Sequence, residues 1–238
     1  SEGLRFCVSE VDYDVVELLS ERIQSLFNLT PHLTKREGCY EVLVNSVRLA
    51  HWWEACGFAK LEPTPGHQGK GYQPYIPDAI LYMNDPQVYA AFLRGLFEAD
   101  GTVTNGVPCW STTHSEFSQE VKNLLLTLGY PTINKVDTSG WGQSDLHVLR
   151  LRNLSYCPKF YDEIGFLSSR KNAAINRDAK QTGNRDYVYL PPDGFQKLAP
   201  RGSRHYEAVQ LSLRRHGGVP RQRAEALYAE TGDEQLGH

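Results

Sequence analysis

One stretch near the middle of the chain, DPQVYAAFLRGLFEADG at residues 85–101, constrains the fold more than any other. Asp85 is a favourable N-cap and Pro86 a favourable first helical residue, so a helix is predicted to begin here. Gly101 is predicted to end the helix in the left-handed conformation. The chain should therefore be organised around one central helix.

The predicted helix carries a stripe of small side chains that recur every four residues: Ala91, Gly95 and Ala99. Bulky apolar residues stand beside the stripe: Phe92, Leu93, Leu96 and Phe97. A stripe of this kind lets another backbone approach closely, a device best known from membrane helices but general in its geometry.

Two acids, Glu98 and Asp100, stand at the C-terminal tip of this helix. The helix dipole is already negative there, so acids are unfavourable unless a cation is bound. Helix carbonyls and a carboxylate together make a hard oxygen site that suits Mg²⁺. A buried core helix that ends in a solvated Asp-Gly turn explains the carboxylate equally well.

The rest of the chain contains a weak internal repeat. The first set of predicted elements comprises a strand at 3–10, a helix at 12–29, a strand at 39–44, a helix at 49–56 and the pair Gly57-Phe58. The second set comprises a strand at 107–113, a helix at 115–128, a strand at 147–152, a helix at 159–164 and the pair Gly165-Phe166. Strands and Gly-Phe pairs match at offsets of 107 and 108 positions, which indicates duplication.

The repeat also assigns the strand faces. In HVLRLR, residues 147–152, Leu149 and Leu151 share one side and Arg150 and Arg152 the other. The offset of 107 matches Leu149 and Leu151 to Val42 and Val44, so these two valines are predicted to lie on the apolar side of their own strand. The arginine side is either an ordinary solvated face or a surface that binds a ligand.

Charge and cysteine content restrict the function only loosely. The net charge of −3 argues weakly against a general nucleic-acid binder, but residues 170–225 hold 12 Lys and Arg against 5 Asp and Glu. This basic stretch is either a footprint for phosphate or a solvated tail. Five scattered cysteines without a CxxC pair favour a reducing cytosol, and no apolar run is long enough to span a membrane.

These residues carry a family resemblance. LRGLFEADG at 93–101, with its flanks IPDAIL and AAFLRGLFEADGTV, resembles the signature of LAGLIDADG homing endonucleases, in particular the dodecapeptide type embedded in inteins. The similarity extends over roughly residues 3–175. It implies an α+β fold of pseudo-repeated αββαββα units with saddle-shaped antiparallel sheets. It divides the chain into an incomplete first half (1–73), a second half (74–175) and a basic helical segment (176–238).

In that family two such helices pack together, and each brings one metal-binding acid to the centre. The offset of 108 would place the partner of Asp100 before residue 1. We therefore expect the first LAGLIDADG helix to be missing and the chain to be truncated at both ends. Its small-residue stripe would then lack an intramolecular partner, and self-association is expected.

The resemblance also implies site residues. Asp100 is the expected Mg²⁺ ligand, and Lys171, with Lys70 in the first half, is the expected catalytic lysine. The polar sheet face would lie in the major groove of double-stranded DNA at a long asymmetric site. Residues expected on or near that face are Arg150, Arg152, His114, Thr112, Lys35, Arg36 and Lys135.

The C-terminal segment is predicted to form two helices, at 205–216 and 221–231, around HGGVP. A helix–turn–helix that binds DNA is one interpretation, but Gly-Gly-Val-Pro is also a plain interhelical loop, which we favour. In inteins this region leads toward the C-terminal splicing strands.

The sequence thus predicts an intein-borne homing endonuclease whose intact parent hydrolyses both DNA strands with Mg²⁺, and a chain that is inactive alone. The alternatives are a LAGLIDADG protein that binds DNA or RNA without cleavage, as maturases and some regulators do, and a decayed intein. An acid at position 100 favours the nuclease, because a pure binder gains nothing from a carboxylate beside phosphate.

Overall fold

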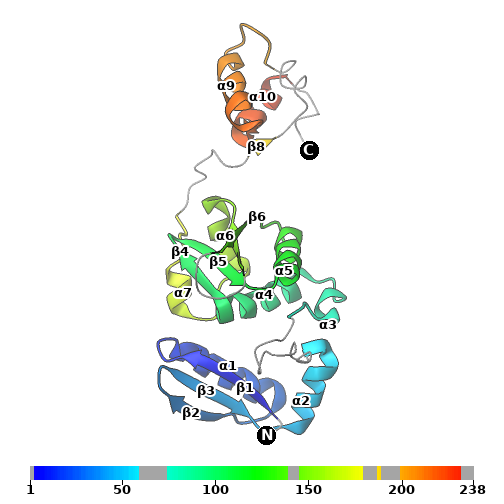
Figure 1. Ribbon diagram of the computed structural model, residues 1–238, viewed down its shortest axis with the longest axis vertical. Helices are drawn as coiled ribbons and strands as arrows, with labels where there is room; N and C mark the ends of the chain where they lie inside the picture. Colours follow the sequence, from blue (N-terminus) through cyan, green and yellow to red (C-terminus); the bar gives the residue numbers. More distant parts are fainter. Residues whose placement is uncertain (1–2, 59–73, 139–144, 179–186, 189–198, 232–238) are drawn as a thin grey trace. The chain divides into compact units, whose positions relative to one another are not determined.

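The computed structural model describes residues 3–58, 74–138, 145–178, 187–188 and 199–231 (Figure 1). The chain divides into two compact units, Ser1–Asp178 and Ala179–His238. No helix among the described residues is both long enough and apolar enough to cross a membrane.

The first part of unit 1 is a three-stranded antiparallel sheet with helices. Its elements in chain order are β1 (Leu4–Ser9), α1 (Tyr13–Phe27), β2 (His32–Arg36), β3 (Cys39–Val44), α2 (Val47–Trp53) and the helical turn η1 (Glu54–Phe58). The strand order is β1-β3-β2. Val42 and Val44 are almost completely buried against α1, as the repeat predicts.

The second part of unit 1 is a four-stranded antiparallel sheet with the order β4-β5-β7-β6. Its elements in chain order are α3 (Asp78–Leu81), α4 (Pro86–Asp100), β4 (Gly101–Thr104), β5 (Val107–Thr112), α5 (Ser115–Thr127), β6 (Thr132–Asp137), β7 (Leu146–Leu151), η2 (Leu154–Tyr156), α6 (Cys157–Glu163) and α7 (Ser169–Ala173). The core contains aromatic residues from several elements, among them Phe97, Trp110, Tyr130 and Phe160.

The two parts repeat one topology. The order β1-β3-β2 of the first sheet matches β5-β7-β6 of the second, with one helix between the first two strands in each case. The second part adds α4 and β4, for which the described residues of the first part hold no counterpart. The predicted α+β fold with antiparallel sheets is confirmed.

In unit 1, three strands were not predicted individually: β2, β4 and β6. All three lie at sheet edges and consist mostly of polar residues, so the sequence shows little apolar alternation there. The first helix also ends earlier than predicted, because Asn28 adopts a left-handed conformation with φ 53° and its N–H caps the helix.

Helix α4 begins as predicted but ends differently. Asp85 Oδ1 accepts a hydrogen bond from Gln87 N at 2.8 Å, and Pro86 starts the helix. Gly101 is extended, with φ −91°, so the predicted left-handed stop is wrong. Glycine is required here for space instead: a Cβ would lie 2.3 Å from Phe97 O.

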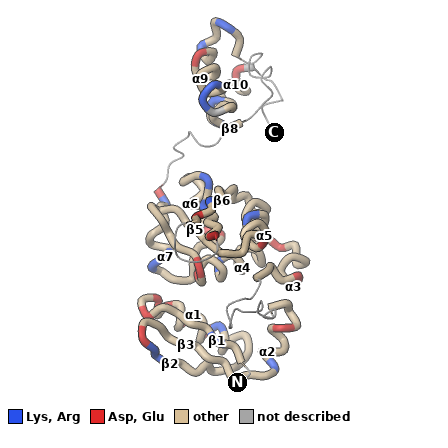
Figure 2. The backbone as a smooth tube through the Cα atoms, in the orientation of Figure 1, with Lys and Arg blue, Asp and Glu red and all other residues tan. Residues whose placement is uncertain are grey.

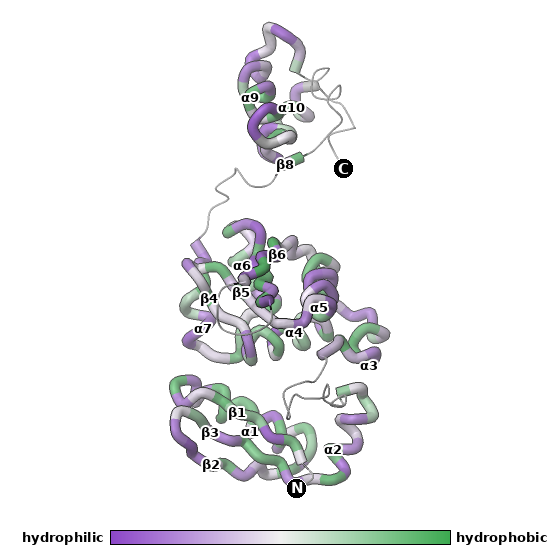
Figure 3. Tube along the Cα trace, viewed as in Figure 1, coloured by the Kyte–Doolittle hydropathy of each residue, from purple (hydrophilic) through white to green (hydrophobic). Residues whose placement is uncertain are grey.

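Unit 2 has a small core of its own. Its elements are β8 (Tyr187–Val188), α9 (Tyr206–His216), β9 (Val219–Pro220) and α10 (Arg221–Thr231). The two short strands pair in antiparallel fashion. Buried apolar residues come from both helices, from the turn between them and from the segment before α9: Val209, Ala224, Leu227, Val219 and Ala199. Both predicted helices are present, and hydrophilic stretches occupy much of their length (Figure 3).

Candidate active centre and nucleic-acid interface

The two acids at the tip of α4 have different environments. Glu98 is half-buried, and one carboxylate oxygen accepts hydrogen bonds from Leu167 N at 2.8 Å and from Ser168 N at 2.9 Å. Asp100, two residues later, is exposed. The Glu98 carboxylate is therefore occupied by hydrogen bonds to the segment that follows α6. Asp100 is the acid at this tip that a ligand could reach.

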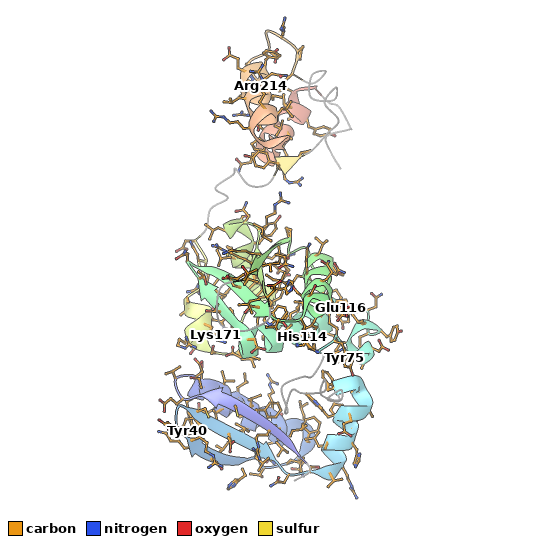
Figure 4. All side chains as sticks on the ribbon, viewed as in Figure 1. Tyr40, Tyr75, His114, Glu116, Lys171 and Arg214 are labelled. Atoms are coloured by element: carbon orange, nitrogen blue, oxygen red, sulfur yellow. The ribbon has the colours of Figure 1, made fainter. Side chains whose placement is uncertain are left out.

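Lys171 lies beside the same tip of α4 (Figure 4). Its Nζ donates to the backbone carbonyl oxygen of Glu98 and lies 3.6 Å from Glu98 Oε1. It also lies 5.5 Å from the centroid of the Phe166 ring. The lysine side chain is only 13% exposed, so its cation is held at the tip of α4 by Glu98 rather than free in solvent.

Residues 167–171, LSSRK, connect this tip to the first part of unit 1. The Arg170 guanidinium donates to both carboxylate oxygens of Asp12, at 2.7 and 2.8 Å. Ser169 donates to Asp14 Oδ2 through its N–H at 2.7 Å and through its hydroxyl at 2.6 Å. One short segment thus binds acids from both parts of the unit.

These contacts change the ionisation of their partners. The hydrogen bonds from Ser169 lower the pKa of Asp14 below its ordinary value, because they stabilise the charged carboxylate. The hydrogen bonds to Asp12 raise the pKa of Arg170. Asp12 itself is 5% exposed, so Arg170 neutralises an almost buried carboxylate.

The small-residue stripe of α4 is open. Ala91, Gly95 and Ala99 are all exposed, and no atom of the described residues lies within 4 Å of where a Gly95 Cβ would stand. The opposite side of the helix carries Leu93 and Phe97, which are buried in the core. Within the described part of the chain, the stripe contacts no second helix.

The polar face of the second sheet forms a concavity of about 410 Å³. It is lined by residues of all four strands: Thr102, Thr104, Cys109, Trp110, Ser111, Ile133, Lys135, Val148 and Arg150. Arg150 lies in register with Cys109 on β5 and Ile133 on β6. Leu149 and Leu151 point to the opposite, buried side, as the alternation predicts.

Two cations in this concavity, Arg150 and Lys135, form no ion pair with any described acid. Arg152 follows β7 on the same side by alternation, and its N–H pairs with Pro131 O at 2.9 Å. Burial raises the pKa of the Cys109 thiol despite the nearby arginine, so this cysteine stays protonated. The face therefore presents positive charge with hydroxyl groups around it.

The corresponding face of the first sheet is more neutral. Glu41 on β3 lies 3.7 Å from Arg5 and 3.1 Å from Arg36, so one acid is shared by two arginines. Lys35 is placed on the other side of the sheet, where its Nζ lies 5.7 Å from the Tyr40 ring centroid. The two adjacent cations of β2 thus do not share a face.

Two other predicted contacts lie away from the concavity. By alternation Thr112 lies on the side of β5 opposite to Cys109 and Ser111, and its hydroxyl accepts a hydrogen bond from His114 N at 3.2 Å. His114 precedes α5 and lines a separate cleft of about 420 Å³ together with Tyr75 and Glu116 (Figure 4). Lys70 lies outside the described residues.

Sequence reasoning missed the roles of Glu98, Asp12, Asp14 and Arg170. Asp14 and Ser169 are 155 positions apart, and Asp12 and Arg170 158, so no local pattern joins them. The available signal was weak: LSSRK is rich in donors and follows the second Gly-Phe pair, where Lys171 was already singled out.

Comparison with known proteins supports the resemblance. Residues 87–165 match the model of the LAGLIDADG-like domain. A DNA polymerase of Thermococcus sp. (strain GE8) is 35% identical over 118 residues, which is 44% of this chain and 7% of the polymerase. A DNA polymerase of Thermococcus litoralis is 36% identical over 111 residues, 42% of this chain and 6% of that protein. The chain thus spans less than a tenth of the length of these relatives.

Among solved structures, the fold is similar to that of a variant of the homing endonuclease I-DmoI, in complex with its nicked target DNA in the presence of Mn. The TM-score is 0.51, and the match covers 68% of this chain and 79% of that one. At 16% sequence identity the similarity concerns the fold. The LAGLIDADG resemblance inferred from the central helix is confirmed.

Proposed function

Because residues 87–165 match the model of the LAGLIDADG-like domain, we propose that this chain is part of an intein-borne homing endonuclease. In the intact parent, both strands of a long asymmetric DNA site are hydrolysed with Mg²⁺. The observation that carries the proposal is that one helix tip ends in an exposed acid, Asp100, and that Lys171 is held at the same tip by Glu98.

The chemistry of the helix tip fits Mg²⁺. Asp100 offers one exposed carboxylate next to helix carbonyls, and Mg²⁺ is usually held by one or two carboxylates, several waters and phosphate oxygens. When bound, the ion would lower the pKa of a water and stabilise charge on the phosphate. One carboxylate oxygen of Glu98 already accepts from two backbone N–H groups and the other lies 3.6 Å from Lys171 Nζ, so Asp100 would be the ligand from this helix.

Lys171 would act beside the scissile phosphate. A cation at this point stabilises the negative charge that develops during phosphoryl transfer. Glu98 orients it, since both the carbonyl and the carboxylate of that residue contact the ammonium group. Lys70 remains the predicted equivalent for the other strand.

DNA binding would use the polar face of the second sheet. Arg150, Arg152 and Lys135 supply the positive charge, and arginine can bridge O6 and N7 of guanine in the major groove. Arg36, with Thr112, His114 and Lys35 at the margins, would contribute backbone contacts at most. Binding should weaken steeply with salt, because phosphate contacts release counterions.

The intein context follows from the extent of the matches. A similarity that covers 6 to 8% of a DNA polymerase is what an endonuclease inserted into a host protein would produce. The basic segment 176–238 would then lead toward the splicing region of the parent.

A second candidate is a LAGLIDADG protein that binds nucleic acid without cutting it. It is favoured by one observation: within the described residues α4 is the one helix that carries the LAGLIDADG-like sequence, LRGLFEADG, with its terminal acid Asp100. Cleavage of two strands requires metal at two phosphates, and one carboxylate holds Mg²⁺ weakly. We therefore propose that this chain alone binds DNA and leaves it intact.

The test combines complementation with a variant. The chain is incubated with supercoiled target plasmid in Mg²⁺, alone and with a polypeptide that supplies an α4–β4-like helix and strand. We expect cleavage only in the mixture, and Asp100→Asn should reduce it by about three orders of magnitude while DNA binding persists. Full cleavage by the Asp100→Asn mixture would refute the metal role.

The open stripe on α4 provides a second readout. We propose that Ala91, Gly95 and Ala99 drive self-association until such a helix is supplied. Sedimentation should show dimers or larger species for the chain alone and a 1:1 complex after complementation. A stable monomer whose sedimentation is unchanged by Gly95→Lys would contradict this.

A further inference from the structure

We propose that unit 2 carries a duplex-DNA-binding site of its own, a helix–turn–helix formed where α9 ends and α10 begins. Four residues, 217–220, join the two helices, which is the usual length for this motif. The sequence alone favours a plain loop at this position, but the geometry of the turn and the charge around it favour DNA binding. The inference does not depend on the proposed nuclease.

The turn is fixed rather than loose. Gly217 has φ +70°, a conformation that favours glycine, and its N–H donates to Leu213 O at 2.9 Å. The Ser212 hydroxyl donates to Gly218 O at 2.8 Å. Val219 is completely buried, so the turn is anchored in the core. The two helices are therefore held in one relative orientation.

A groove of about 550 Å³ runs along the two helices. Arg215 lines it from the end of α9, and Gln222 and Arg223 line it from the start of α10. None of its ten lining residues is acidic. The nearby acid Glu230 is already bound by Arg204 and by His205, whose ring lies 3.1 Å from the carboxylate.

The arginines cluster at the junction of the helices (Figure 2). Arg223 stands in the first turn of α10, which contains no acid. Cations at a helix N-terminus are unfavourable, because the dipole there is already positive. A bound anion would remove this penalty, and the arginines from α9 and α10 would share it.

Duplex DNA is the partner that fits this arrangement. Arg215 and Arg223 would contact phosphates along the groove, and such contacts fix the position of a protein on the duplex. In a helix–turn–helix the start of the second helix enters the major groove of DNA. The major groove of duplex RNA is too narrow for side chains to read, so RNA fits less well.

The experiment measures binding of the full chain to a labelled 30-base-pair duplex by fluorescence anisotropy at several salt concentrations. We expect Arg215→Ala/Arg223→Ala to weaken binding about tenfold and to reduce the salt slope by about 2. The matched control is Arg214→Ala, an exposed arginine of the same helix that does not line the groove. It should change binding less than twofold.

Two further variants keep the outcomes separate. Arg215→Lys/Arg223→Lys should restore the salt slope, because lysine still contacts phosphate, and circular dichroism checks the fold. In Arg150→Ala/Lys135→Ala, which disables the sheet face, residual binding should remain and still depend on Arg215 and Arg223. Loss of all binding in that variant, unchanged binding by the double alanine variant, or tighter binding to duplex RNA would each overturn the proposal. If disabling the sheet face has no effect, the proposed role of the sheet fails instead.

Discussion

The two parts of unit 1 share one topology but differ in how their aromatic residues are covered. Phe160, 108 positions after Trp52, is completely buried and packs against Phe97 with ring centroids 5.2 Å apart. Trp52 is 50% exposed. Its ring centroid lies 5.6 Å from that of Phe27 and 6.4 Å from that of Trp53. In the second part α4 covers Phe160, whereas in the first part Phe27 at the end of α1 leaves half of Trp52 exposed.

The same difference appears at the sheet edges. In the second sheet β4 pairs with β5, whereas the equivalent edge of β1 has no partner strand within the described residues. An α4–β4 segment therefore contributes twice to its half, once by covering aromatic residues and once by closing a strand edge. The comparison indicates that such a segment completes the half to which it belongs.

The largest predicted difference between the two parts is in the loss of unfolding free energy when an equivalent aromatic residue is removed. Phe160→Ala should cost about 3 to 5 kcal/mol of unfolding free energy, because it leaves a cavity between α4 and α6. Trp52→Ala at the equivalent position should cost about 1 kcal/mol, since half of that ring is already in solvent. Urea unfolding followed by far-ultraviolet circular dichroism measures both. Equal costs would mean that the first part is as well covered as the second.

The contrast was only partly predictable. Alternation in HVLRLR assigned Leu149 and Leu151 to the core and Arg150 to the polar face, because period-two patterns follow directly from strand geometry. The N-terminus of α4 was also predictable from Asp85 and Pro86, which act locally.

The rest depends on partners distant in sequence. The three edge strands β2, β4 and β6 form only because a neighbouring strand offers hydrogen-bonding groups. Those neighbours are β3, β5 and β7, respectively. Gly101 was correctly expected to end the helix, but crowding by Phe97 O is a packing fact that local rules do not contain. The anchoring of Glu98 by residues 167 and 168 is of the same kind.

The second prediction concerns the contact that joins the two halves. Arg170→Ala should cost about 1 to 2 kcal/mol, because it leaves Asp12 almost buried without its bidentate donor. The cost stays below that of a fully buried ion pair, since the guanidinium is 55% exposed. Urea unfolding measures it.

A double variant controls this prediction. In Asp12→Asn/Arg170→Ala the uncompensated charge is gone, so part of the stability should return. If the double variant is no more stable than Arg170→Ala alone, the charge of Asp12 is not the cause.

The third prediction compares the two sheet faces. Arg150→Ala should weaken DNA binding about tenfold, whereas Arg36→Ala should weaken it about twofold, because Glu41 already neutralises Arg36. Glu41→Gln should then strengthen DNA binding two- to threefold, because it removes the acid that neutralises Arg36. Binding that tightens in this variant and weakens in the arginine variants is explained by an acid that the arginines share. Anisotropy titrations at fixed salt measure all three. Equal losses for the two arginines would show that both faces contact DNA alike.

The smallest predicted effect is a pH dependence at the Asp14–Ser169 contact. Ser169 lowers the pKa of Asp14 in the folded chain below the ordinary value of 3.8. Stability from this contact is therefore fully present above that value and is lost as the pH falls through the lower folded pKa. Ser169→Ala should reduce the unfolding free energy at pH 6 by less than about 1 kcal/mol, because the carboxylate is partly exposed. The difference from wild type should shrink toward zero in strong acid.

Ser25→Ala is the matched control, since its exposed hydroxyl donates to a backbone carbonyl and no carboxylate titrates there. A Ser169→Ala difference that stays constant into strong acid would show that Asp14 is not the group that this serine stabilises.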